Sequence, residues 1–116
     1  MIDDPLVFKK LVEELSRFDP DFLITYVNHT DVNDGISPCV LMGELFDVFC
    51  AIEQQSVTNQ VLSIIGDYYS KGGVTFRNAV DVSFLEGYVI QNRTIDRLPD
   101  SLAEPAGRIL AAIETE

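Results

Sequence analysis

Three helix starts divide the first half of this chain into short units and constrain its fold. At each one, a residue suited to helix capping precedes a proline: Asp4-Pro5, Asp19-Pro20 and Ser37-Pro38. Aspartate and serine are preferred N-cap residues, and proline fits the first helical turn because the amide hydrogen it lacks has no partner there. Apolar residues follow each start at intervals of three and four, which is typical of amphipathic helices. In the first two units they are Phe8, Leu11, Val12 and Leu15, then Phe22, Leu23, Tyr26 and Val27.

The third unit is the most apolar. Its apolar residues form one stripe with further apolar residues beside it: Leu41, Leu45, Val48 and Ile52, with Met42, Phe46 and Phe49. A helix that is apolar on most of its surface is buried, so we expect this unit to be the central helix. The preceding helix should fade by Asp31, because residues 31–35 (DVNDG) are rich in turn formers.

Two helices are predicted in the next part of the chain. The first runs from about Val57 to Ser70, and Gly72-Gly73 should end it. Its inward residues should be Val61, Ile64, Ile65 and Tyr68. The second runs from roughly Thr75 to Gln91, with Phe76, Val80, Phe84 and Tyr88 four residues apart. Residues 79–84 (AVDVSF) alternate as in a strand, but we favour a helix because the four-residue spacing persists for longer.

The last segment begins with turn chemistry at residues 98–101 (LPDS). A final helix should then carry Ile109, Leu110 and Ile113, with Pro105 in its first turn. No linker, low-complexity run or repeat interrupts the 116 residues, and 47% apolar content supports a real core. The expected fold is all-α: one domain over residues 1–116, with five or six short helices in an antiparallel, bundle-like arrangement.

The cysteines and the N-terminal segment favour a cytoplasmic protein. Cys39 and Cys50 are expected on one helix, about 16 Å apart along its axis, which is too far for a disulfide. Two reduced, mostly buried thiols fit a reducing compartment. The first ten residues have neither the basic nor the apolar region of a signal peptide, and no apolar run approaches the length that spans a bilayer.

The acidic residues are concentrated in one part of the chain. The formal net charge is −11, and residues 18–70 contain eight acidic residues and no Lys or Arg. This excess argues against binding nucleic acid or an anionic membrane, whose charges would repel it. It favours a basic partner, although a solvated acidic surface that only maintains solubility is an equally good interpretation. Tyr69 lies among these acids and is expected to be exposed, whereas Tyr26 and Tyr68 are expected in the core.

No catalytic or metal-binding motif is evident, so we expect a non-enzyme without cofactor or metal. His29 is the only histidine and is expected to be a capping or surface residue. Residues 31–35 invite a calcium interpretation, but glycine and glutamate are missing from the required EF-hand positions. A small hydrolase or transferase stays open as a minor alternative, and it would need a pocket around His29 and Cys39.

Residues 78–86 read Asn-Ala-Val-Asp-Val-Ser-Phe-Leu-Glu and are followed by Leu98-Pro99 and a last helix. This pattern resembles a family of small, acidic, all-helical bacterial proteins, whose members look like the immunity proteins that accompany polymorphic or contact-dependent toxins. The likeness covers the C-terminal half by motif and the whole chain by size and helix order. The resemblance implies a helical inhibitor whose partner is a toxin. It also implies that Phe84 and Leu85 report the fold rather than the function.

The main functional hypothesis is therefore an immunity protein that covers the basic active face of a cognate toxin. The residues expected to contact the partner are Asp31, Asp34, Glu44, Asp47, Glu53, Asp67 and Tyr69. The alternative is a helical adaptor or self-associating structural protein, such as a homodimer, that uses exposed apolar parts of Val57, Ile90 or Ile95.

Overall fold

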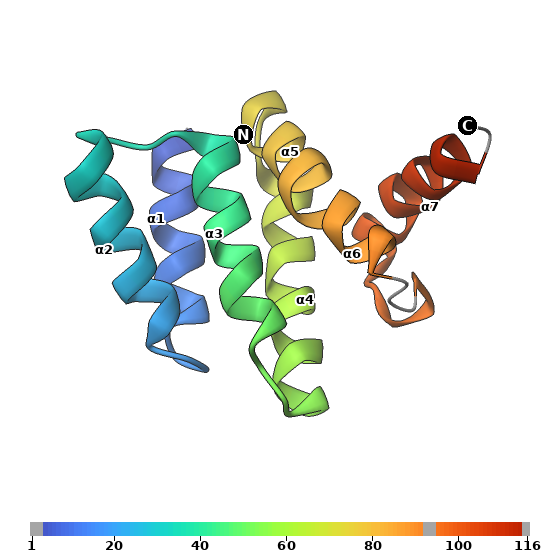
Figure 1. The fold of residues 1–116 in the computed structure, drawn as a ribbon, viewed down its shortest axis with the longest axis horizontal. Helices are drawn as coiled ribbons and strands as arrows, with labels where there is room; N and C mark the ends of the chain where they lie inside the picture. Colours follow the sequence, from blue (N-terminus) through green and yellow to red (C-terminus); the bar gives the residue numbers. More distant parts are fainter. Residues whose placement is uncertain (1–3, 92–94, 115–116) are drawn as a thin grey trace.

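A computed structural model describes residues 4–91 and 95–114, and this part of the chain contains helices and no strand (Figure 1). The helices are α1 (Asp4–Leu15), α2 (Asp21–Asn33), α3 (Pro38–Cys50), α4 (Gln55–Lys71), α5 (Val74–Val80), α6 (Glu86–Ile90) and α7 (Asp100–Glu114). A π-helical segment, Asp81–Leu85, joins α5 to α6, and a 3-10 turn, Ile95–Arg97, precedes α7. Because α5, the π segment and α6 form one continuous helix, the prediction of an all-α fold with five or six helices is confirmed.

The predicted positions of the helix starts are confirmed, but the Ser37 side chain forms no capping hydrogen bond, and Pro20 rather than Asp19 is the cap residue of α2. The helices α1, α2 and α3 begin at or directly after the three cap-and-proline pairs. At the second of these starts, the Asp21 amide donates a hydrogen bond to Asp19 Oδ1 at 2.9 Å. The glycine pair after α4 also acts as predicted, because the Gly72 amide donates to the Tyr68 carbonyl at 2.8 Å and the helix ends there.

The end of α2 differs from the prediction. The helix continues through Asp31 to Asn33 instead of fading by Asp31. It stops because Asp34 adopts the left-handed conformation, with φ 51° and ψ 48°, and its amide donates to the Thr30 carbonyl. Aspartate tolerates this conformation and glycine does so even better, and Gly35 follows with φ 136°. The turn-forming residues therefore act two positions later than expected.

The predicted helix over 75–91 contains a wider turn. In the π segment the Glu86 amide donates to the Asp81 carbonyl, five residues back instead of four. A strict four-residue spacing overshoots the 3.6 residues of an α-helical turn, and the wider turn offsets part of this overshoot. As a result Phe76, Val80, Phe84 and Tyr88 are all buried, as predicted. The strand interpretation of residues 79–84 is wrong.

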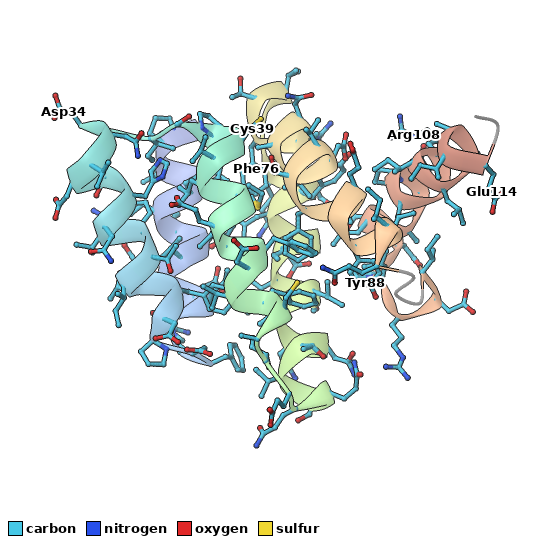
Figure 2. All side chains as sticks on the ribbon, in the orientation of Figure 1. Asp34, Cys39, Phe76, Tyr88, Arg108 and Glu114 are labelled. Carbon is cyan, nitrogen blue, oxygen red and sulfur yellow. The ribbon has the colours of Figure 1, made fainter. Side chains whose placement is uncertain are left out.

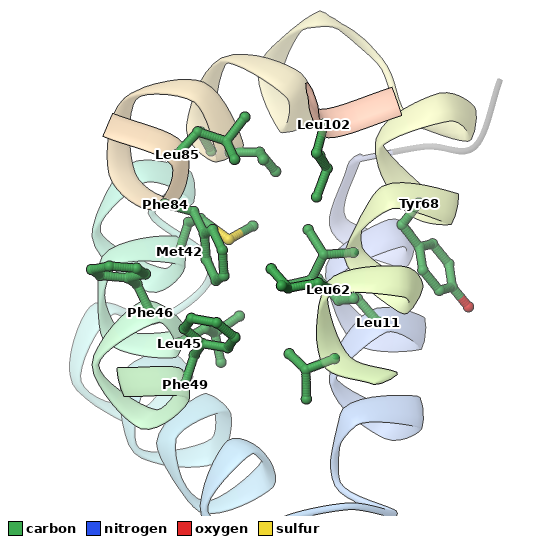
Figure 3. Packing of buried hydrophobic residues seen from close by; sticks show 14 of the residues in the cluster. Leu11, Met42, Leu45, Phe46, Phe49, Leu62, Tyr68, Phe84, Leu85 and Leu102 are labelled. Carbon is green, nitrogen blue, oxygen red and sulfur yellow. The ribbon is translucent and has the colours of Figure 1, made fainter. Parts of the chain in front are cut away.

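The helices form two layers around one core. The helices α2, α3 and α5–α6 lie in one layer, and α1, α4 and α7 lie in the other (Figure 1). Figure 3 looks between the layers, where Met42, Phe49 and Phe84 approach from one side and Leu11 and Leu62 from the other. Helix α3 contacts α2 on one flank and α5 and the π segment on the other, so it is the central helix of its layer.

An aromatic cluster joins α3 to the π segment. The Phe84 ring centroid lies 5.0 Å from that of Phe46 and 5.1 Å from that of Phe49, in edge and tilted geometries that aromatic pairs favour. All three side chains are buried. The neighbouring predicted core positions Val48 and Ile52 are only half-buried, because they lie towards the edge of α3 or beyond its end.

The two cysteines correct an expectation about burial. They lie at the two ends of α3 and are free thiols, but Cys39 is exposed and Cys50 is half-buried. Cys39 lies in the first turn of α3 (Figure 2). The Cys50 thiol is 3.6 Å from Gln91 Oε1, to which it donates.

The outer helices α2 and α7 bury less than their patterns predict. Leu23 and Val27 of α2 are exposed although Phe22 is buried and Tyr26 is half-buried, because α2 is the edge helix of its layer and only one face is covered. Two larger corrections concern α7. Pro105 is its sixth residue and not in its first turn, and the predicted inward residues Ile109 and Leu110 are half-buried while Ile113 is exposed.

Two helical glycines should respond oppositely to alanine. A Cβ at Gly66 would lie 2.6 Å from Pro99 Cγ and 2.8 Å from Ser101 Oγ, whereas one at Gly107 meets nothing within 4 Å. We expect Gly66→Ala to lower the free energy of unfolding by about 1–3 kcal/mol through overpacking. Gly107→Ala should raise it by about 0.5–1 kcal/mol through helix propensity. Urea denaturation of both variants checks this, and equal effects would contradict the close approach of α7 to α4.

Candidate functional site: an acidic surface

The seven predicted contact residues do not share one environment. Asp31, Asp34, Asp47, Glu53 and Asp67 are exposed, whereas Glu44 and Tyr69 are half-buried. The exposed ones occupy the end of α2, the outer side of α3, the α3–α4 connection and α4. The predicted contact residues therefore lie on several separate parts of the molecular surface.

Three acidic residues are exposed on the layer formed by α2, α3 and α5–α6. Asp31 follows buried His29 by two residues and Asp47 follows buried Leu45 by two, which places each carboxylate on the side of its helix away from the core. Asp34 lies beyond the end of α2, at the far tip of the α2–α3 loop (Figure 2). We call Asp31, Asp34 and Asp47 the α2–α3 acidic face.

Glu44 is held by a buried histidine. The side chain of His29 is fully buried, and its Nδ1 lies 2.6 Å from Glu44 Oε1. The Ser37 amide donates to His29 Nε2 at 3.0 Å. A backbone amide can only donate, so Nε2 is an acceptor and the neutral ring carries its proton on Nδ1, from which it donates to Glu44. The expectation that His29 is a surface residue is wrong: it ties the α2–α3 loop to both helices.

The hydrogen bond between His29 and Glu44 makes Glu44 a structural residue. Glu44→Ala leaves a buried N–H without an acceptor, so we expect the free energy of unfolding to fall by about 1–3 kcal/mol. Glu44→Gln keeps a side-chain oxygen and should lose less. Asp47→Ala, one turn further along α3 and exposed, should stay within about 0.5 kcal/mol of the original chain. Chemical denaturation ranks the three variants, and a loss for Asp47→Ala as large as that for Glu44→Ala would refute this role.

Tyr69 belongs to a contact between α4 and the next helix. Its hydroxyl donates to Asp81 Oδ1 at 3.0 Å, and the Arg77 guanidinium lies 5.7 Å from its ring centroid. Arg77 Nε also donates to the Tyr69 carbonyl at 2.9 Å. Burial, and then the hydrogen bond to Asp81, raise the pKa of Tyr69. The residue expected to be exposed is therefore half-buried, and the cation on its ring comes from this chain.

Asp67 lies on a different face from Asp47. It follows buried Ile65 by two residues, so it points away from the core on α4. Because α3 and α4 belong to opposite layers (Figure 1), the outward sides that carry Asp47 and Asp67 face in opposite directions. One partner surface of ordinary size cannot be centred on both.

Glu53 lines an open cleft at one end of the helices. The cleft measures about 320 Å³ and lies between the α1–α2 turn and the α3–α4 connection. Its lining residues are Phe18, Asp19, Ala51, Ile52, Glu53, Gln54 and Val57. The sequence predicts Asp19 as a helix cap and gives no role to Phe18. An aromatic residue directly before an acidic one is the one local hint of the cleft.

The acids of residues 18–70 form no ion pair with a Lys or Arg of the described residues. In residues 4–91 and 95–114, one ion pair joins an Arg or Lys to a carboxylate, Arg108 Nε with Glu104 Oε1 at 3.6 Å on α7. None of the eight acids takes part in it. Arg77, for example, donates to the Tyr69 and Ser70 carbonyls at the end of α4 and not to a carboxylate.

The described residues contain no group of three or more His, Cys, Asp or Glu side chains placed to hold a metal ion. Within the same residues, no helix has both the length and the apolar character to cross a membrane. Both ring nitrogens of His29 are engaged with Glu44 and Ser37, so in this conformation His29 is not available as a base for Cys39.

Comparison with known protein families, with curated proteins and with solved structures finds no match to this chain.

Proposed function

We propose that this chain is a non-catalytic inhibitor of the immunity type, which binds a basic toxin in the cytoplasm and occludes the toxin's active face. The observation that carries the proposal is the charge of residues 18–70: eight carboxylates, six of them exposed, and no Lys or Arg. Like charges without counter-charges repel one another, and a basic partner relieves this repulsion on binding. Such a surface also accelerates the encounter with a basic protein.

The α2–α3 acidic face is the surface that we assign to the partner. Its three carboxylates are exposed: Asp31 on α2, Asp34 directly after α2, and Asp47 on the neighbouring helix α3. Glu44 contributes charge beside them but also holds His29, so its replacement affects stability as well as binding. Asp67 and Tyr69 are left out of this surface because of their positions on α4.

The proposal is tested by a growth-protection assay against a basic toxin encoded beside the gene of this chain. The triple variant Asp31→Asn, Asp34→Asn and Asp47→Asn should lose most of the protection. A matched triple variant, Asp67→Asn, Asp96→Asn and Glu114→Gln, removes as many charges from exposed positions elsewhere and should retain it. Circular dichroism controls for folding. Equal protection by both variants would refute the assigned surface, and no protection by the original chain would refute the function.

Asp31 and Asp34 should act on the rate of association. They lie at the tip of α2 and its following loop, where a basic partner meets them early. Asp31→Asn with Asp34→Asn should slow association with the toxin several-fold at low ionic strength and leave dissociation nearly unchanged. The deficit should shrink towards physiological salt, where the screening length is about 8 Å. Stopped-flow measurements over a salt series check this, and an unchanged association rate at every salt concentration would show that the loop is only a connector.

Self-association is a second candidate function, favoured by one observation. Ile90 at the end of α6 is 61% exposed, whereas Val57 and Ile95 are half-buried and therefore offer less apolar surface. An apolar contact strengthens with salt, while an acidic contact with a basic partner weakens. Sedimentation of the pure protein separates the two functions: a dimer that persists in high salt and is lost in Ile90→Ser favours self-association.

A further inference from the structure

The cleft at the end of the helices combines an apolar wall with two carboxylates. Phe18 is 42% exposed although it is a large aromatic residue, and it lines the cleft together with the half-buried side chains Ile52 and Val57. Asp19 and Glu53 line the same cleft from its two loops. Such a lining suits a ligand that is both apolar along its length and positively charged at its end.

The carboxylates at this cleft have no ion-pair partner among the described residues. One oxygen of Asp19 accepts the Asp21 amide at 2.9 Å, and neither Asp19 nor Glu53 forms an ion pair within the described residues. Two described cations lie near the lining in sequence or by contact: Arg17 directly precedes Phe18 but forms no ion pair with Asp19 or Glu53, and Arg97 donates to Gln55 Oε1. A cation from outside is therefore the complementary occupant, and an anion would be repelled.

An arginine side chain meets these requirements best. Its planar guanidinium can stack on an aromatic ring and donate several hydrogen bonds to carboxylates at once. Its methylene stem can lie against aliphatic side chains such as Ile52 and Val57. A lysine ammonium offers the same charge but is compact and strongly hydrated, so it gains less from a ring and an apolar wall.

We infer that this cleft binds an arginine side chain of the basic partner and anchors that partner at the end of the helices. The inference rests on the proposed function, since it names the side chain by which the same partner is held. Phe18 supplies the stacking surface, Glu53 and Asp19 supply the acceptors, and the α2–α3 acidic face steers the partner in.

A peptide titration followed by amide NMR signals tests the cleft itself. The probe is an acetylated pentapeptide amide with one arginine flanked by glycines, compared with lysine and with citrulline at the same position. Citrulline keeps the shape of arginine without its charge. We expect saturable shifts at Phe18, Asp19 and residues 51–54 with arginine, several-fold weaker binding with lysine, and no saturation with citrulline.

Two variants and one control assign the binding to named groups. Glu53→Gln and Phe18→Leu should each weaken arginine binding several-fold, the first by removing charge and the second by replacing the ring with an aliphatic group of similar bulk. Asp67→Asn removes one charge from the exposed side of α4, outside the cleft lining, and should leave binding unchanged. The NMR spectrum of each variant reports its fold. Shifts spread over all acidic residues, or equal weakening by Asp67→Asn and Glu53→Gln, would overturn the inference.

The growth-protection assay separates this inference from the proposed function. The double variant Glu53→Gln, Phe18→Leu should lose part of the protection given by the original chain. Full protection by the double variant would overturn the anchoring role and leave the acidic-face function standing. Arginine binding in the cleft of a chain that protects against no toxin would refute the proposed function and leave the cleft as a binding site.

Discussion

Phe84→Ala is expected to lower the free energy of unfolding by about 3–5 kcal/mol, the range for removing a buried phenylalanine ring. Phe84 is fully buried and touches both Phe46 and Phe49 at ring-centroid distances of 5.0 and 5.1 Å. Its removal opens a cavity between α3 and the π segment, and the rigid helices on both sides can collapse only in part. Because a domain of this size is stable by only about 5–15 kcal/mol, the variant should lose a large fraction of its free energy of unfolding.

Val82→Ala provides the matched control for Phe84→Ala. Val82 lies two residues earlier in the same π segment and is 50% exposed. Its truncation should change the free energy of unfolding by no more than about 0.5 kcal/mol. Urea denaturation followed by circular dichroism compares the two variants with the original chain. A loss below about 1 kcal/mol for Phe84→Ala would show that the aromatic cluster does not hold the two helices together.

Alkaline pH should destabilise the fold through Tyr68. Burial, and then the hydrogen bond to Glu14 and the charges of Glu14 and Glu13, raise the pKa of Tyr68 from 10.0 to about 12. Between these values the folded chain keeps a phenolic proton that the unfolded chain releases, so the free energy of unfolding falls as pH rises from 10 through 12. This contribution to stability is fully present below pH 10 and is lost as the pH rises through 12.

Tyr68→Phe isolates this contribution. Both chains share the other groups that titrate at high pH, including Tyr69, so the difference between them reports Tyr68. The stability of the original chain should fall more steeply from pH 10 upward than that of the variant, and spectrophotometric titration should show one phenol fewer ionising late. Parallel stability curves for the two proteins would contradict the raised pKa of Tyr68.

The helices were predictable because their signals are local. A cap residue followed by proline, a glycine pair after the last turn and apolar spacing of three or four act within a few residues along the chain. The starts of α1, α2 and α3 and the end of α4 are confirmed for this reason. The predicted end of α2 at Asp31 is wrong because the helix ends where one residue, Asp34, adopts the left-handed conformation. The earlier residues of the turn-forming run stay helical.

The candidate site was less predictable because exposure depends on neighbours far apart in sequence. The helical pattern around Glu44 and Tyr69 places both off the apolar stripe, yet His29 lies 15 residues before Glu44 and Asp81 lies 12 residues after Tyr69. Each partner approaches only when two helices pack. Cys39 shows the reverse case: the sequence predicts a buried thiol, but the thiol is exposed.

The order of residues alone was enough for the all-α class, the positions of most helix ends and the separation of acidic from basic residues, because capping, periodicity and charge are properties of short segments. The packing of two layers was needed to place Asp47 and Asp67 on opposite faces, to bury His29 against Glu44 and Ser37, and to bring Phe18 and Asp19 beside Glu53. These juxtapositions join residues that are distant along the chain, and they arise only when the apolar faces of whole helices are buried against one another.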